Sequence, residues 1–115
     1  MTRTLFTPFR LKNLELPNRI VMAPMTRSRA DAAGVPRAST ATYYAQRASA
    51  GLIISEAINI SADAVGSPLT PGLYSDQQIA AWQQVTAAVH AAGGKIYAQL
   101  WHTGRVGHSS VRGGL

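Results

Sequence analysis

Three short apolar runs, residues 19–23, 52–56 and 95–100, stand apart in the sequence, and each leads directly into polar residues. Runs of this length are typical of parallel strands whose sheet is covered by helices. Pro24 follows the first run, and because proline lacks a backbone N–H it ends a strand. We therefore predict three strands, each of which opens into a polar loop at its carboxyl end.

Two segments between these runs predict helices. Residues 39–50 begin at Ser39, a favourable N-cap, and end before Gly51, a favourable residue just after a helix. The second helix begins at Ser75, and Gln78 stands at the spacing of a capping box. Apolar residues then recur at helical spacing and predict a buried stripe. The stripe consists of Ile79, Trp82, Val85 or Thr86, and Val89.

Ahead of the first run, residues 6–16 predict a short hairpin that turns at Lys12–Asn13. The order hairpin, strand, helix, strand, helix, strand indicates an α/β protein, and right-handed crossovers place the three carboxyl ends on one side. In α/β sheets and β/α barrels, the active and ligand-binding sites lie at the carboxyl ends of the parallel strands. Three parallel strands do not close a barrel, which typically takes about 250 residues. We therefore interpret residues 1–115 as the N-terminal part of a (β/α)8 TIM barrel. This part holds about three β/α units plus the hairpin, so it is a single domain that is incomplete in this chain and whose third strand is an exposed edge.

Composition narrows the function classes. The formal net charge is +6, from 11 Lys and Arg against five Asp and Glu, but the cations are spread singly. A nucleic-acid-binding face would show clustered cations interleaved with aromatic residues, so no nucleic-acid partner is predicted. The absence of cysteine excludes disulfides, thiolate metal sites and a cysteine nucleophile. There is neither a signal peptide nor a run of about 20 apolar residues, so we expect a cytoplasmic protein with no membrane segment.

Several common signatures of catalysis are missing from the sequence. No glycine-rich phosphate loop follows a strand, and no GxSxG-like turn indicates a serine hydrolase. His90, His102 and His108 have no second ligand at metal-binding spacing, so no metal site is predicted.

Polar side chains at the predicted strand ends are the candidate site residues. Gln99 shares one side of its strand with Tyr97 and Trp101, and an inward-facing amide needs either neighbours or a ligand that offers both a donor and an acceptor. Spacing alone leaves both interpretations of Gln99 open, and Thr26 is either a plain loop hydroxyl or a ligand contact. Trp101 and Tyr97 are by default packing residues. Glu56 is expected to be a structural residue, paired or hydrogen-bonded.

Five sequence motifs cover almost the whole chain. They are LFTP, PNRIVMAPMTRSRA, YYAQRASAGLIISEA, PGLYSDQQIAAW and AQLWHTGRVGHSS. In this order and spacing, the chain resembles the N-terminal part of the old yellow enzyme family, the FMN-dependent ene-reductases, and within it the bacterial N-ethylmaleimide and pentaerythritol tetranitrate reductases. The resemblance implies an oxidoreductase that holds FMN non-covalently, takes hydride from NAD(P)H and reduces C=C bonds activated by carbonyl or nitro groups.

The resemblance also implies roles for individual residues. The Thr26 hydroxyl would bond the flavin O4, where negative charge grows on reduction, and would thereby raise the reduction potential. Thr26 and Trp101 would border the substrate. Gln99 would pair with the flavin N3–H and O2, and Ala57 would contact the pyrimidine side of the ring. The full set of implied cofactor contacts is Ala23, Pro24, Met25, Thr26, Ala57 and Gln99.

Other functional groups of the family would lie beyond residue 115. They are a His paired with His or Asn that holds the substrate, a proton-donating Tyr, an Arg beside the flavin, and the phosphate-binding loops. We therefore expect no catalytic residue in this chain, and no activity until the remainder of the barrel joins it as a partner. The alternative is a non-catalytic fragment that acts as an assembly or interaction module through its exposed edge. One local departure from close relatives is Gly66–Ser67–Pro68, which stands where they carry an aromatic residue.

Overall fold

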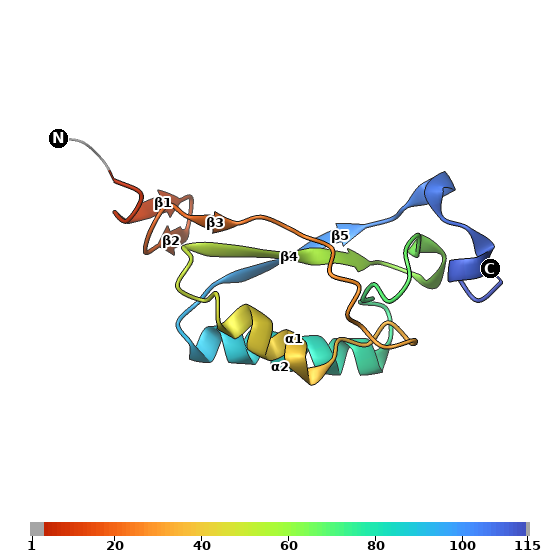
Figure 1. The fold of residues 1–115 in the computed structure, drawn as a ribbon. Coiled ribbons are helices and arrows are strands. Elements are labelled where there is room, and N and C mark those ends of the chain that lie inside the picture. Colours follow the sequence, from red (N-terminus) through yellow and green to blue (C-terminus); the bar gives the residue numbers. More distant parts are fainter. Residues whose placement is uncertain (1–3, 115) are drawn as a thin grey trace.

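The computed structural model describes residues 4–114 of the chain. An antiparallel hairpin is followed by two strand–helix units and a last strand (Figure 1). The elements are β1 (Phe9–Leu11), β2 (Leu14–Leu16), β3 (Val21–Met22), α1 (Ala38–Ala45), β4 (Leu52–Asn59), α2 (Asp76–Ala91) and β5 (Ile96–Trp101), with 3-10 turns η1 (Ala62–Ala64), η2 (Gly104–Val106) and η3 (Ser109–Val111).

The three later strands form a parallel sheet in the order β3-β4-β5. Both helices lie on one face of this sheet and pack against each other (Figure 1). The predicted hairpin, the order of elements and the parallel sheet are therefore confirmed. Residues 4–114 form no closed barrel, because β3 and β5 each have a single neighbour in the sheet.

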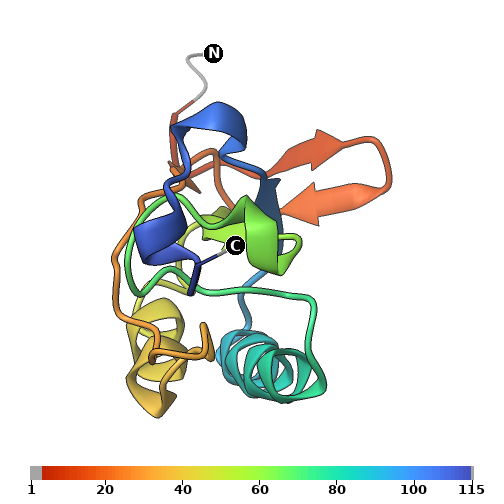
Figure 2. The ribbon, with the colours of Figure 1, turned by 90° about the vertical axis from the view of Figure 1, so that its right-hand side faces the viewer.

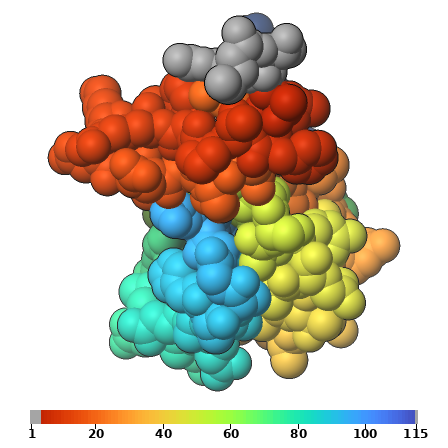
Figure 3. All heavy atoms as spheres, turned by 90° about the vertical axis from the view of Figure 1, so that its left-hand side faces the viewer, coloured from red at the N-terminus to blue at the C-terminus, as the bar shows by residue number. Residues whose placement is uncertain are grey.

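The two ends of the sheet differ in what covers them. The hairpin lies at the end where β4 and β5 begin (Figure 3). The turns η1, η2 and η3 gather at the opposite end, where β4 and β5 finish (Figure 2). The carboxyl ends of β4 and β5 therefore face a cluster of loops, as the sequence predicts.

A buried apolar layer between the sheet and the helices forms the core. It consists of Tyr44, Ala48, Ile53, Ile58, Trp82, Val85 and Val89. The predicted stripe on α2 is confirmed at Trp82, Val85 and Val89 but is wrong at Ile79, which is 42% exposed. Gln78 is buried instead, because its side chain completes the capping box and also donates to the Ala33 carbonyl at 3.0 Å.

The first helix is shorter than predicted. It begins at Ala38 after Arg37, which makes no side-chain capping bond, and it ends at Ala45, so the predicted cap at Ser39 is wrong. After Ala45 the backbone bonds tighten to residues three apart. Gly51 is needed for close packing, since a Cβ there would lie 2.2 Å from the carbonyl oxygen of Asn18.

Strand bounds also differ from the sequence pattern. The first strand spans only Val21–Met22, two residues of the predicted five, whereas β4 runs three residues past its predicted end to Asn59. β4 contains a bulge: Ile54 pairs with Tyr97 and Ala57 with Gln99, so two residues of β4 stand opposite one of β5. The bulge decides which β4 side chains face the helices.

Candidate functional site

The predicted site residues lie in the carboxyl-terminal halves of β4 and β5 and in the segment that follows β3. Residues 23–26 continue from β3 and run beside β4 (Figure 1), and all four are exposed. Ala57 is a buried residue of β4 and is paired with the exposed Gln99 of β5. Paired residues of neighbouring strands share a face of the sheet, so Ala57 and Gln99 lie side by side.

Gln99 points away from the helices. Its strand neighbours Ile96 and Ala98 line a groove with α2, so alternation along β5 places Gln99 on the opposite, uncovered face. Within residues 4–114 the side-chain amide of Gln99 forms no hydrogen bond, and its backbone N–H donates to the Ser55 hydroxyl at 3.2 Å. No side chain or backbone group among the described residues satisfies the Gln99 amide, and its role as a ligand contact stays a prediction.

Trp101 is held by a residue that the sequence pattern does not reveal. Its indole N–H donates to the Asn59 side-chain oxygen at 2.8 Å. Asn59 is fully buried, and its amide nitrogen donates to the Thr70 hydroxyl at 2.9 Å and to the Pro71 carbonyl at 3.0 Å. The hydrogen bond to Asn59 therefore fixes the orientation of the Trp101 ring. β4 also contains the polar residues Ser55 and Glu56, so the sequence offers no signal that singles out Asn59.

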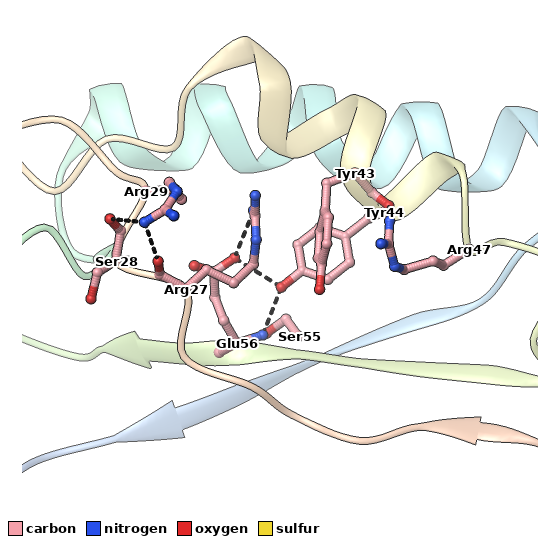
Figure 4. A network of polar contacts seen from close by, with 8 residues as sticks. All are labelled: Arg27, Ser28, Arg29, Tyr43, Tyr44, Arg47, Ser55 and Glu56. Atoms are coloured by element: carbon pink, nitrogen blue, oxygen red, sulfur yellow. Dashed lines mark hydrogen bonds and ion pairs between the residues drawn. The ribbon is translucent and has the colours of Figure 1, made fainter.

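Glu56 is a structural residue, as predicted. The Tyr44 hydroxyl donates to the Glu56 carboxylate at 2.8 Å and accepts from the Glu56 backbone N–H at 2.7 Å (Figure 4). Arg27 lies 3.6 Å from the same carboxylate oxygen. Burial raises the pKa of Glu56, while the Tyr44 hydrogen bond and the Arg27 charge act to lower it. Burial also raises the pKa of Tyr44, so its hydroxyl stays protonated as a donor.

Arg27 makes a second contact that the sequence does not predict. Its guanidinium lies 3.7 Å from the centre of the Tyr43 ring, and that of Arg47 lies 3.9 Å from the same centre. The two cations lie on opposite sides of the ring (Figure 4). Arg47 also donates to the Tyr43 carbonyl at 2.8 Å. The loop that follows β3 is thereby tied to α1.

The loops beyond β4 and β5 are joined by polar contacts. His102 lies 3.7 Å from the Asp63 carboxylate, and the Ser61 hydroxyl also donates to it. The Ser61 hydrogen bond, with a smaller contribution from His102, lowers the pKa of Asp63. Among the described residues, no three side chains of His, Asp or Glu are grouped so that they could ligate a metal ion.

Comparison with known proteins identifies the family. The NADH:flavin oxidoreductase / NADH oxidase family matches residues 4–112. The chain belongs to this family. The old yellow enzyme homologue from Zymomonas mobilis superposes with a TM-score of 0.93 at 55% identity, over 96% of this chain and 31% of that one. Morphinone reductase, solved with tetrahydroNAD, gives a TM-score of 0.91 at 56% identity over 96% and 30%. A chanoclavine-I aldehyde reductase of Penicillium roqueforti is 56% identical over 88% of this chain and 28% of its own length.

The chain thus spans less than a third of the length of these relatives. The solved relatives are old yellow enzymes with the TIM-barrel fold, and residues 4–114 correspond to a fragment of that fold. FMN, held non-covalently, and NAD(P)H are the cofactor and the reductant of this flavoprotein family. None of the helices that the structure describes has the length and apolar character needed to span a bilayer.

Proposed function

We propose that this chain supplies one wall of the FMN site of an ene-reductase, which uses NAD(P)H to reduce C=C bonds activated by a carbonyl or nitro group. One observation carries the proposal. The Gln99 amide offers a donor and an acceptor on the uncovered face of the sheet, and it forms no hydrogen bond within residues 4–114. The edge of the flavin pyrimidine presents the complementary N3–H and O2. The small Ala57 beside Gln99 leaves room for a flat ring.

Thr26 has a proposed role in setting the reduction potential of the cofactor. Its side chain is exposed on the segment that follows β3, and its hydroxyl forms no hydrogen bond within the described part of the chain. A fixed donor directed at the flavin O4 would stabilise the more negative reduced ring and raise its potential. FMN supplies the hydride chemistry when it is bound. Ala23, Pro24 and Met25, exposed on the same segment, would line the ring.

The substrate side of the site is assigned to Trp101. Its indole is fixed through Asn59 to the loop at Thr70 and Pro71, so the ring has one preferred orientation at the end of β5. Such a ring can border an alkene that approaches the flavin. Small activated alkenes are the proposed substrates.

The proposed partner is the remainder of the barrel. An apolar groove of about 230 Å³ lies between β5 and α2, and Ile79, Trp82 and Ile96 are among its lining residues. β5 has no neighbour on its outer edge within residues 4–114, and Leu100 is 58% exposed beside it. A further strand and helix placed there would pair the edge and fill the groove. We expect the isolated chain neither to hold FMN tightly nor to turn over.

A chimera tests the proposal. Residues 4–112 replace the matching segment of the Zymomonas mobilis homologue, and the purified protein is assayed for flavin absorbance and for cyclohexenone-dependent oxidation of NADPH. We expect both. Gln99→Ala should weaken FMN binding about 30-fold, because two hydrogen bonds of about 1 kcal/mol each are lost. Gln84→Ala, an exposed glutamine of α2, is the matched control and should leave binding unchanged.

Two results would count against parts of this proposal. A folded chimera whose FMN affinity is the same with and without the Gln99 amide would remove the proposed role of this residue. The interaction module remains the second candidate, because the β5 edge and the groove are uncovered in residues 4–114. A colourless, symmetric oligomer of the isolated chain would favour the module, whereas a yellow complex with a larger polypeptide would favour the enzyme.

A further inference from the structure

The segment that carries Thr26 has almost no backbone support. Between Pro24 and Arg29, no backbone–backbone hydrogen bond is formed with any other part of residues 4–114. The next anchored backbone group is the N–H of Ala30, which donates to the Leu69 carbonyl at 3.0 Å. Side chains must therefore fix where this segment lies.

Arg27 is the side chain of this segment that reaches into the protein. Only 17% of it is exposed, and it lies between the sheet and α1. There it meets the Glu56 carboxylate at 3.6 Å and covers the Tyr43 ring at 3.7 Å. Figure 4 shows Arg27 entering this space from the loop, with Tyr43 and Glu56 arriving from α1 and β4. A planar guanidinium can satisfy an ion pair and a ring stack at once, whereas an ammonium group cannot.

The surroundings of Arg27 are themselves fixed. Glu56 is held by two hydrogen bonds to Tyr44, and the Tyr43 ring is held from its other side by Arg47. Directly after Arg27, Ser28 adopts a left-handed backbone conformation with φ 51°, which turns the chain at this anchor. Arg29 donates to the carbonyls of Arg27 and Ser28 and closes this turn. Movement of the Arg27 side chain would therefore displace the neighbouring Thr26.

We propose that Arg27 is a positioning residue that fixes the Pro24–Arg29 segment, and with it the Thr26 hydroxyl, through its joint contact with Glu56 and Tyr43. The positioning of the segment is a property of the chain alone. Its consequence for the flavin rests on the proposed function. Arg27 does not itself touch the cofactor in this proposal, because its guanidinium lies on the helix side of the sheet.

Backbone ¹⁵N relaxation of the chain tests the proposal without flavin. In the native chain we expect the amides of Thr26 and Arg27 to have order parameters of about 0.85, as rigid backbone does. Arg27→Lys keeps the charge beside Glu56 but removes the stacked plane, and it should lower these values to below about 0.6. The Ile53 amide, which donates to the Lys95 carbonyl at 2.8 Å, is the internal reference and should not change. Arg37→Lys, at an exposed arginine, is the matched control.

A second measurement uses the flavin potential of the chimera described above. Arg27→Lys should lower the potential in the same direction as Thr26→Ala, because the donor is no longer held in place, and Arg37→Lys should leave it unchanged. The positioning role would be overturned if the amides of Thr26 and residue 27 kept order parameters of about 0.85 in Arg27→Lys while the Ile53 amide was unchanged. If Arg27→Lys unfolds the isolated chain, an unchanged potential in the chimera overturns it. Suppose that Arg27→Lys lowers the order parameters in the isolated chain but the unsubstituted chimera binds no flavin. This outcome would refute the proposed function and leave the positioning role of Arg27 standing.

Discussion

Tyr44→Phe removes one hydroxyl from the buried contact between α1 and β4. This hydroxyl both donates to the Glu56 carboxylate and accepts from the Glu56 backbone N–H, at 2.8 and 2.7 Å. Tyr44 is 1% exposed and Glu56 is 2% exposed, so water does not replace either bond. The ring remains, so no cavity of consequence forms.

The expected loss of stability follows from these two bonds. A hydrogen bond to a charged group contributes about 2 kcal/mol, and a buried N–H left without a partner costs about 1 kcal/mol more. We therefore expect the free energy of unfolding to fall by about 3 kcal/mol at neutral pH. Urea denaturation followed by tryptophan fluorescence measures it, since the Trp82 ring lies 6.4 Å from that of Tyr44.

The loss should depend on pH in a defined direction. Burial raises the pKa of Glu56 in the folded state above its ordinary value of 4.5, so its contribution to stability is full below that pH and is lost as pH rises through the folded pKa. The Tyr44 hydrogen bond opposes this shift. Tyr44→Phe should therefore raise the pKa of Glu56 further. The free energy of unfolding should fall more at neutral pH than below pH 4.5.

Tyr43→Phe is the matched control for this experiment. The Tyr43 hydroxyl forms no hydrogen bond within residues 4–114, and its ring keeps its place between Arg27 and Arg47. Its removal should change stability by less than about 0.5 kcal/mol. A loss of less than about 1 kcal/mol for Tyr44→Phe, or one no larger than that of Tyr43→Phe, would contradict the proposed strength of these two hydrogen bonds.

Three further changes probe other parts of the chain. Thr26→Ala should lower the flavin potential of the chimera by about 30 mV, equivalent to about 1.4 kcal/mol on a two-electron couple, and a spectroelectrochemical titration measures it. Gly51→Ala places a Cβ 2.2 Å from the Asn18 carbonyl oxygen, so we expect thermal unfolding to show a loss of at least about 2 kcal/mol. Asn59→Leu frees the indole of Trp101 from its 2.8 Å bond, and a fluorine label on that indole should report a narrower, shifted resonance.

Local signals in the sequence predict the elements that depend on local bonds. The capping box at Ser75 and Gln78 places the start of α2, because both of its bonds lie within four residues. The hairpin around Lys12 likewise forms between neighbours, and Lys12 takes a left-handed conformation in its turn. Short apolar runs mark all three parallel strands, a pattern typical of a sheet covered by helices, although within residues 4–114 only β4 is largely buried.

Contacts between distant residues explain what the sequence could not predict. The close packing of the turn before β4 depends on the approach of Gly51 to Asn18, which lies in the loop between β2 and β3. The orientation of Trp101 depends on Asn59, 42 residues earlier. The loop around Gly66 packs against Thr103, since a Cβ on Gly66 would lie 2.6 Å from that side chain. An aromatic residue at Gly66, where the resemblance leads us to expect one in close relatives, would disturb this close contact.

The bulge in β4 links these long-range contacts to the candidate site. With strict alternation, Ser55 and Ala57 would both face the helices, and Ile58 would face away from the core. One extra residue places Ser55 and Glu56 together on the helix side, so Ala57 moves to the open face beside Gln99 and Ile58 returns to the core. The Ser55 hydroxyl accepts the Gln99 N–H at 3.2 Å and replaces the ladder bond that the bulge interrupts. A single inserted residue therefore places Glu56 where it contacts Arg27 and sets the small Ala57 beside Gln99.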